Sequence, residues 1–414
     1  MRAMGVALAV SIACVGGALA EPKGGKRADV TLGYGALYQS DHLSGLAALR
    51  LGLSTETRTQ SLRFDLDAAR LSAIGTQAQS ALRYRRKSKS SLIDLHLRYS
   101  RKPAGAVVFG PDQGRRFLDI TGSNMPENAG LAHLAVHTGL GRPVGLEVDL
   151  RHRFRKTNAT KGRRNAVEAA LRLDIDKRSS LKFGAGVERF TQATSQDSRY
   201  GFVAFTHTPN NRLTAHARLG WRDVDTRSGP EWQFKLAKTR KRGELFGSIS
   251  QRQTVSGRLT EAHGGVARQL NAGTLRYRFG AAQLSGQSAE LVGSLSYAQT
   301  FPLGEIAVQL SRGFVGSDLS AGVRLASRGA VQMQRKLGEL GALDLRIDVA
   351  NSDANTTLNG QRMAQMRVAY THEISAAWAL ATGAQRRVSK EAGSARQTTN
   401  GVFLRLERKF SGGW

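Results

Sequence analysis

The sequence has little cysteine, proline and acidic charge, and it has no long apolar run beyond its first twenty residues. Its 414 residues include one cysteine and 8 prolines, and the 32 Asp and Glu are far outnumbered by 61 Lys and Arg. No stretch after residue 20 approaches the ~18 uninterrupted apolar residues of a membrane helix, which excludes a helical membrane anchor. The formal net charge of +29 by itself favours a nucleic-acid partner.

The N-terminus changes that interpretation. MRAMGVALAVSIACVGGALA has an early Arg2, an apolar run, and Ala18-Leu19-Ala20 before Glu21, which predicts a secretory signal peptide over residues 1–20. A lipoprotein signal with Cys14 as the lipidated residue is the alternative, but Ser11 and Ile12 fit it poorly. Cleavage after residue 20 removes the only cysteine, so the exported chain is expected to form no disulfide and to have no thiol chemistry.

Alternation of apolar residues with a period of two dominates from about residue 30 to 410 and predicts an all-β chain. Counting alternating runs back from the C-terminus gives about 22 strands, with a range of roughly 18 to 22. Tight turns alternate with longer polar connections, as in a meander closed across a bilayer. The longer connections are predicted at 157–163, 192–198, 223–229, 351–358 and 388–397, and the longest of all at 102–129.

The residues between the apolar ones are charged. In LDLRIDV (343–349), Asp344, Arg346 and Asp348 alternate with Leu and other aliphatic residues. A small soluble barrel with this pattern would bury unpaired charges, which is unfavourable. The pattern therefore predicts a single transmembrane antiparallel β-barrel with apolar rows toward lipid and a polar lumen, in which closure satisfies the backbone hydrogen bonds.

The predicted organisation is a signal peptide (1–20), a short periplasmic segment (21–29), the barrel (30–410) and a C-terminal overhang (411–414). Outer-membrane barrels typically end in a strand whose terminal aromatic is read by the insertion machinery. The last strand fits this description, so we predict an insertion signal made of Leu404, Leu406, Phe410 and Trp414. Arg408 interrupts this lipid-facing row and is expected to extend toward the interface.

Three stretches, 51–69, 291–313 and 368–383, resemble an uncharacterised, porin-like family of outer-membrane β-barrel proteins from alphaproteobacteria. The resemblance rests on turn phrases such as Thr55-Glu56-Thr57-Arg58 and Leu303-Gly304-Glu305. It implies a barrel fold and location in the outer membrane of a Gram-negative bacterium, and it supplies no site residues.

Candidate sites for chemistry are few. His133 and His137 lie on one face of a strand about 13 Å apart, too far to share a metal ion, so they are interpreted as lumen-wall residues. Gly139-Leu140-Gly141 and Gly184-Ala185-Gly186 follow no βαβ unit and are interpreted as strand glycines or bends. No Ser, His and acid constellation can be assembled. We therefore expect no enzyme activity, no metal, no cofactor and no nucleic-acid partner.

The basic excess is the most informative chemical feature. The arginines predicted to line the lumen are Arg98, Arg151, Arg153, Arg155, Arg172, Arg218, Arg276, Arg278, Arg346 and Arg405. A positive wall favours anions inside a pore, but opposite charges on neighbouring strands can also simply pair. Basic turns and loops such as Lys161 to Arg164 are expected to meet outer-membrane lipid and lipopolysaccharide.

These observations predict a passive diffusion channel of the outer membrane that favours anionic solutes and is inserted by the barrel-insertion machinery. The alternative is a non-conducting structural or interaction barrel. A TonB-dependent transporter has a plug domain before its barrel. That class is disfavoured at this point, because the strand pattern starts within about ten residues of the predicted cleavage site and leaves no room for a plug there. An autotransporter is disfavoured because no passenger domain precedes the barrel. Oligomeric state is left open.

Overall fold

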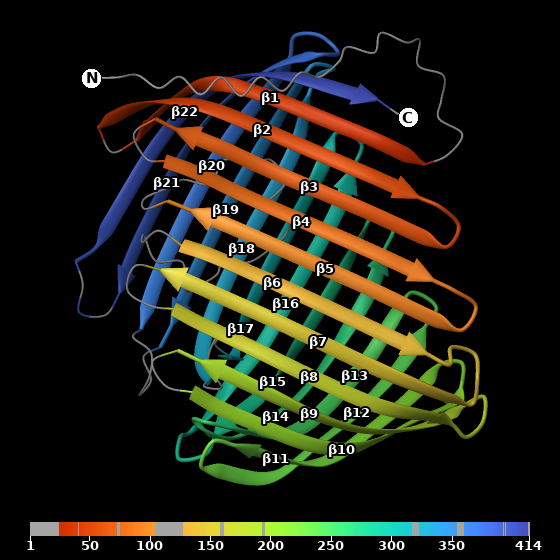
Figure 1. Ribbon diagram of the computed structural model, residues 1–414. Helices are drawn as coiled ribbons and strands as arrows, with labels where there is room; N and C mark the ends of the chain where they lie inside the picture. Colours follow the sequence, from red (N-terminus) through yellow and green to blue (C-terminus); the bar gives the residue numbers. More distant parts are fainter. Residues whose placement is uncertain are drawn as a thin grey trace.

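The computed structural model shows one closed antiparallel barrel of 22 strands. The structure describes residues 25–39, 41–72, 75–103, 127–157, 161–192, 195–316, 323–353, 360–391, 393 and 395–412. Each strand pairs with its neighbours in sequence, and β1 pairs with β22 to close the sheet (Figure 1). The predicted fold class and strand number are confirmed. Among the described residues no helix is long and apolar enough to cross a bilayer.

The strands are long enough to span a hydrocarbon core when tilted, because about ten residues suffice for a transmembrane strand. Their bounds are β1 Lys26–Gln39, β2 His42–Glu56, β3 Gln60–Leu71, β4 Gly75–Lys87, β5 Ser91–Lys102, β6 Glu127–Thr138, β7 Val144–Thr157, β8 Lys161–Asp174, β9 Ser179–Thr191, β10 Ser195–Asn210, β11 Leu213–Val224, β12 Arg227–Arg240, β13 Gly243–Thr254, β14 Gly257–Leu270, β15 Gly273–Leu284, β16 Ala289–Phe301, β17 Gly304–Gly316, β18 Val323–Leu337, β19 Gly341–Ser352, β20 Gln361–Glu373, β21 Trp378–Glu391 and β22 Gln397–Gly412.

The first and last strands form the seam of the barrel, and both extend beyond the predicted limits of 30 and 410. β1 already begins at Lys26, which pairs with Thr55 of β2. β22 continues to Gly412, which pairs with Ala28 of β1. Each extension is held by ladder hydrogen bonds that the side-chain pattern alone does not reveal. Both described ends of the chain therefore lie at one rim, the terminus rim, and the opposite end is the loop rim.

Several predicted long connections are shorter in the structure. The segment predicted at 223–229 is a two-residue turn, because Val224 pairs with Arg227 and Asp225 adopts a positive φ of 54°. Such a conformation is typical of tight hairpin turns. β10 likewise begins at Ser195, inside the predicted connection 192–198. The polar residues at these strand ends still form ladder pairs. Strand boundaries predicted from polarity were therefore wrong at these positions.

A turn at the terminus rim shows how polar side chains fix these connections. Asp176 accepts hydrogen bonds from the backbone N–H groups of Arg178 (2.5 Å) and Ser179 (2.7 Å). These hydrogen bonds, the one from Arg178 above all, lower the pKa of the Asp176 carboxyl below its ordinary value. The carboxylate thus closes the β8–β9 turn in its charged form.

The two faces of the wall have the expected orientation. On β22 the Arg405 residue is 5% exposed, while the adjacent Leu404 is 52% exposed. On β19 Asp348 is 3% exposed and Val349 is 48% exposed. The charged rows therefore face inward and the apolar rows outward, as the alternation in LDLRIDV predicts.

The inward face also carries an apolar patch beside the seam. Leu37, Leu46, Leu71 and Phe403 are buried there and form one cluster with Ala369 and Ala381. They occupy inward positions on β1, β2, β3 and β22, because Leu37 pairs with Phe403 and Leu46 pairs with Leu71. The lumen wall is thus mostly polar with an apolar section at the seam.

Some sequence predictions fall outside the described residues. These are the signal peptide with Cys14, residues 21–24 of the periplasmic segment, residues 104–126 of the longest connection, residues 158–160, 193–194, 354–358, 392 and 394 of the other predicted connections, and Trp414.

Candidate functional site: the lumen wall

The ladder registers place all the arginines predicted for the lumen on one face of the wall, the inward one. Arg98 stands opposite Ala81, Arg218 opposite Ala204, and Arg405 opposite Ala381, all inward positions. The same registers put Arg151, Arg153, Arg155, Arg172, Arg276, Arg278 and Arg346 on that face. The arginines share a face, but their electrostatic surroundings divide eight of the ten into two groups.

The first group is neutralised within the wall. Arg155 Nη2 lies 2.7 Å from Glu127 Oε2, and both side chains are largely buried. The other contacts are Arg151–Asp149 at 2.7 Å, Arg172–Asp174 at 3.4 Å, Arg346–Asp348 at 2.7 Å, and Arg405 with Glu407. Arg98 belongs to neither group, because the hydrogen bond of 2.6 Å that it donates to His96 does not neutralise its charge. In LDLRIDV, Arg346 therefore pairs with Asp348 two residues along the same strand and on the same face.

The second group forms a cationic arc, which we define as Arg218 on β11, Lys235 on β12, and Arg276 and Arg278 on β15. The registers explain why these side chains lack carboxylates. Arg218 stands between Ala204 and Gln233, and Lys235 between His216 and Ser248. Arg276 stands between Ala267 and Ser296, and Arg278 between Gly265 and Ser294. Within the described part of the chain none of the four has an ion-pair partner.

Two arginines of the arc lie against aromatic rings. The Arg218 guanidinium carbon lies 3.7 Å from the centroid of the Phe202 ring, and that of Arg276 lies 5.1 Å from the Phe246 ring. A cation over a ring face is stabilised without being neutralised. These arginines are therefore held in place while keeping their full positive charge toward the lumen.

Glycines on β9 make room for the rings. A Cβ on Gly184 would overlap the Phe202 ring, and a Cβ on Gly186 would overlap the Tyr200 ring. Tyr200 in turn donates a hydrogen bond of 2.8 Å to Glu168 and carries Arg222 over its face at 4.1 Å. The Gly184-Ala185-Gly186 segment is thus a strand segment, as predicted, and its glycines seat two inward aromatic side chains.

Gly184→Ala is expected to destabilise the barrel by about 1–3 kcal/mol, because the added methyl displaces the Phe202 ring and with it the stacked Arg218. The temperature at which the folded, fast-migrating form is lost on a gel measures this effect. Gly201→Ala on the paired strand is the matched control, since its nearest heavy atom would be a carbonyl oxygen 3.9 Å away. Equal stability of both variants would contradict the assigned packing.

The two histidines of β6 have separate carboxylate partners. His133 Nε2 lies 2.7 Å from Asp149, and His137 Nδ1 lies 3.8 Å from Glu147. Among the described residues no group of three or more His, Cys, Asp or Glu side chains could hold a metal ion. Both histidines therefore contact carboxylates of the lumen wall.

Sequence reasoning missed Lys235 and the two inward rings. Lys235 shares the inward face of β12 with Gln233 and Ala237 and alternates with the outward Phe234 and Leu236, so the period-two pattern contained the signal. Phe202 and Tyr200 carried no such signal, because inward aromatics contradict the simple division into apolar outside and polar inside. Only the pairing of β10 with the glycines of β9 accounts for them.

The three residues of the predicted C-terminal insertion signal that the structure describes lie on the outer face. Leu404, Leu406 and Phe410 are all exposed there. Arg408 shares this face, and its guanidinium lies 5.3 Å from the Trp378 ring and 4.8 Å from the Phe410 ring. An arginine stacked on aromatic residues at a barrel rim is a typical interfacial arrangement.

Comparison with solved structures identifies the same fold in outer-membrane transport proteins. The siderophore receptor PirA from Pseudomonas aeruginosa has a TM-score of 0.54 and 10% identity, with 94% of this chain and 81% of that chain covered. The FrpB iron transporter from Neisseria meningitidis (F3-3 variant) gives 0.58 and 8%, covering 94% and 82%. The copper transporter OprC gives 0.55 and 10%, covering 93% and 80%.

Neither a protein-family model nor a curated protein matches the chain. The resemblance to an alphaproteobacterial family therefore stays a prediction.

The prediction of a passive diffusion channel is wrong, because the matching structures are receptors and transporters for siderophores, copper and iron rather than porins. The argument against a TonB-dependent transporter fails with it, since that argument relied only on where the strand pattern begins. By their printed names these structures are receptors and transporters rather than enzymes. The chain has the fold of these receptors and transporters.

Proposed function

We propose that the protein forms the wall of an outer-membrane uptake receptor for a bulky anionic ligand, such as an anionic ferric chelate. The observation that carries this proposal is the cationic arc inside a barrel of receptor size. Outer-membrane transporters with 22 strands have a plugged lumen, and all described elements here belong to the wall. An element that closed the lumen would lie outside these described strands.

The arc suits a polyanionic ligand better than a neutral one. Its four cations lie on β11, β12 and β15, while carboxylates neutralise much of the remaining wall. A cluster of like charges bounded by a low-dielectric wall concentrates the opposite charge inside the lumen. The wide barrel can admit a ligand larger than the solutes of small barrels.

Binding of two iron complexes of similar size tests the ligand class. A ferric tris-catecholate is anionic, whereas a ferric tris-hydroxamate is neutral. Quenching of tryptophan fluorescence in purified, folded barrel should show at least tenfold tighter binding of the anionic complex, weakening as salt rises. Equal affinity for both complexes, without salt dependence, would sink the proposed ligand class.

An uptake assay tests the receptor role in cells. A host lacking its own ferric-siderophore receptors should accumulate the iron-labelled anionic complex only when it expresses the protein, and a protonophore should stop accumulation. Accumulation that continues unchanged after the proton gradient is dissipated would contradict energised uptake. The exported location, the predicted insertion signal and the insertion machinery as a partner are parts of the same proposal.

A further inference from the structure

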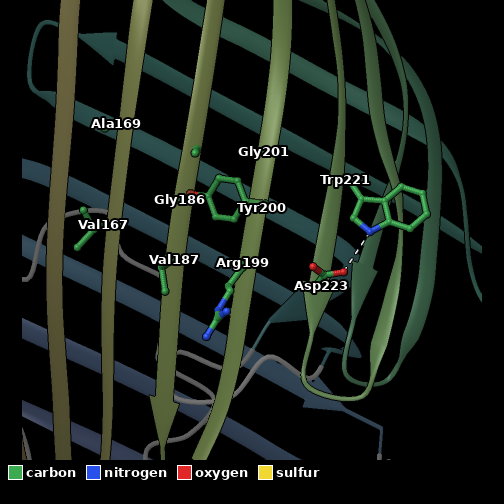
Figure 2. A pocket seen from close by; sticks show the side chains of 10 residues that line it. Val167, Ala169, Gly186, Val187, Arg199, Tyr200, Gly201, Trp221 and Asp223 are labelled. Carbon is green, nitrogen blue, oxygen red and sulfur yellow. Dashed lines mark hydrogen bonds between the residues drawn. The ribbon is translucent and has the colours of Figure 1, made fainter.

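The outer wall carries an apolar groove, and a row of basic side chains leads from this groove toward the loop rim. The groove has a volume of about 420 Å³ and is lined by Val167, Ala169, Ala185, Gly186, Val187, Arg199, Tyr200, Gly201, Trp221 and Asp223 (Figure 2). Most of these residues occupy outward positions on β8, β9, β10 and β11, while Gly186 and Tyr200 belong to the inward rows. The groove therefore opens toward the membrane and not toward the lumen.

Small residues on three adjacent strands form the floor of the groove. Ala169 pairs with Ala185, and Ala185 pairs with Gly201, so the small side chains line up across the wall. Larger apolar residues flank the floor along the strands, with Val187 on one side and Phe183 on the other. A channel of this kind, apolar and cut into a lipid-facing surface, suits an acyl chain.

Basic residues continue from the groove toward the loop rim. Arg199 lines the groove itself. Arg189 is its diagonal neighbour across the ladder, and Arg163 is the diagonal neighbour of Arg189. Each diagonal step spans about 7–8 Å, so Arg199 and Arg163 stand two steps apart, about 15 Å, a span that suits a headgroup with two phosphates rather than a single phosphate. Lys156 extends the row onto β7, because it pairs with Lys161 beside Arg163.

Two carboxylates also lie in this region, and their contacts leave the row positive. Asp197 accepts from Arg189 at 2.8 and 2.9 Å, and Asp223 accepts from Trp221 Nε1 at 3.0 Å (Figure 2). Lys156, Arg163 and Arg199 are exposed and have no ion-pair partner within the described residues. Trp221 beside Arg199 marks an interfacial height, because tryptophans concentrate where headgroups meet acyl chains.

We propose that this groove binds one acyl chain of a phosphorylated outer-leaflet glycolipid, the lipid A part of lipopolysaccharide, whose phosphate groups are held by Arg163 and Arg199. The inference rests on the proposed outer-membrane location, which puts the loop rim at the cell surface and the groove in the outer leaflet. The match of charge selects the occupant. A zwitterionic phospholipid would fill the groove but would leave the basic row largely unmatched.

A second groove on the same wall provides a matched control. It has a volume of about 400 Å³, and its outward lining residues are apolar, including Phe205, Ala217, Phe234 and Ile249. Its charged lining residue Lys235 belongs to the inward row. This control groove has comparable volume and lacks the outward cations, so it separates binding by shape from binding by shape and charge.

The test uses folded full-length barrel in nanodiscs of phosphatidylethanolamine containing a small, fixed fraction of lipid A, with native mass spectrometry counting bound lipid A. The wild type should retain one lipid A. Arg163→Gln with Arg199→Gln should reduce retention at least tenfold, and the groove-filling Gly201→Leu at least threefold. Ala217→Leu in the control groove, and Arg258→Gln with Arg312→Gln elsewhere on the outer wall, should leave retention unchanged.

Three outcomes would overturn the inference: equal retention by all variants, an equal loss in the two controls, or complete displacement by inorganic phosphate, which would indicate an anion site without an acyl chain. Heat-modifiable gel mobility establishes that each variant is folded. If Gly201→Leu does not fold, the exposed arginine pair still decides the question. Because the assay needs no transport, retained lipid A together with absent uptake would refute only the proposed receptor function.

Discussion

Reversing the three arginines of the cationic arc, Arg218→Glu, Arg276→Glu and Arg278→Glu together, is expected to weaken binding of an anionic ferric complex between about tenfold and a hundredfold. A unit charge about 8 Å from a ligand charge contributes roughly 0.5 kcal/mol in water. Three reversals, each changing the charge by two units, therefore remove on the order of 3 kcal/mol, and salt screening reduces this figure. Fluorescence titration at two salt concentrations measures the change.

The matched control keeps the charge and changes the shape. Arg218→Lys, Arg276→Lys and Arg278→Lys together preserve the three positive charges but lose the planar stacking on Phe202 and Phe246. Binding by this variant should stay within a few-fold of the wild type. If charge reversal and the lysine control weakened binding equally, the arc would act through geometry and the proposed electrostatic role would be wrong.

Gly35→Ala is expected to prevent stable closure of the barrel, with a loss of at least about 3 kcal/mol. Gly35 lies on β1 directly opposite Arg405 of β22, and a Cβ there would overlap the carbonyl oxygen of Leu404. The obstacle is backbone, which cannot rotate away as a side chain can. The seam must therefore shift or open. Heat-modifiable gel mobility should show little of the folded form.

Gly401→Ala is the control within the same seam. A Cβ at Gly401 would meet its nearest atom, Leu37 Cδ1, at 3.5 Å, an ordinary van der Waals contact. The two variants add the same methyl group to the same pair of strands. A folded Gly35→Ala barrel with wild-type mobility would show that the seam tolerates a different register.

Much of the wall could be predicted from the sequence. Alternation such as Leu343-Asp344-Leu345-Arg346 assigns each side chain to one of two faces, because consecutive residues on a strand point to opposite sides. Since every strand pairs with its neighbour in sequence, counting strands also gave the size of the barrel. The connections were less predictable. Polar residues end a soluble strand but merely mark the rim of this one, as Arg227 shows.

The division of the lumen charges could not be predicted in this way. Arg155 is neutralised by Glu127 and Lys182 by Glu147, partners that come from other strands. For an arginine with no carboxylate two residues away on its own strand, the register between strands decides whether it meets a carboxylate or an alanine, and a shift of two residues would rearrange these pairs without exposing any apolar face. The cationic arc is therefore a property of register and not of composition.

The sequence by itself determined the fold class, the strand number and the face on which each charged residue lies, because these follow from a local period of two and from the need to satisfy backbone hydrogen bonds in a bilayer. The tertiary structure decided which of these charges remain unpaired in the lumen. It also decided where Ala169, Ala185 and Gly201 meet to form a groove on the outer wall. Both features join residues from separate strands, and only the register of a closed sheet fixes which of them become neighbours.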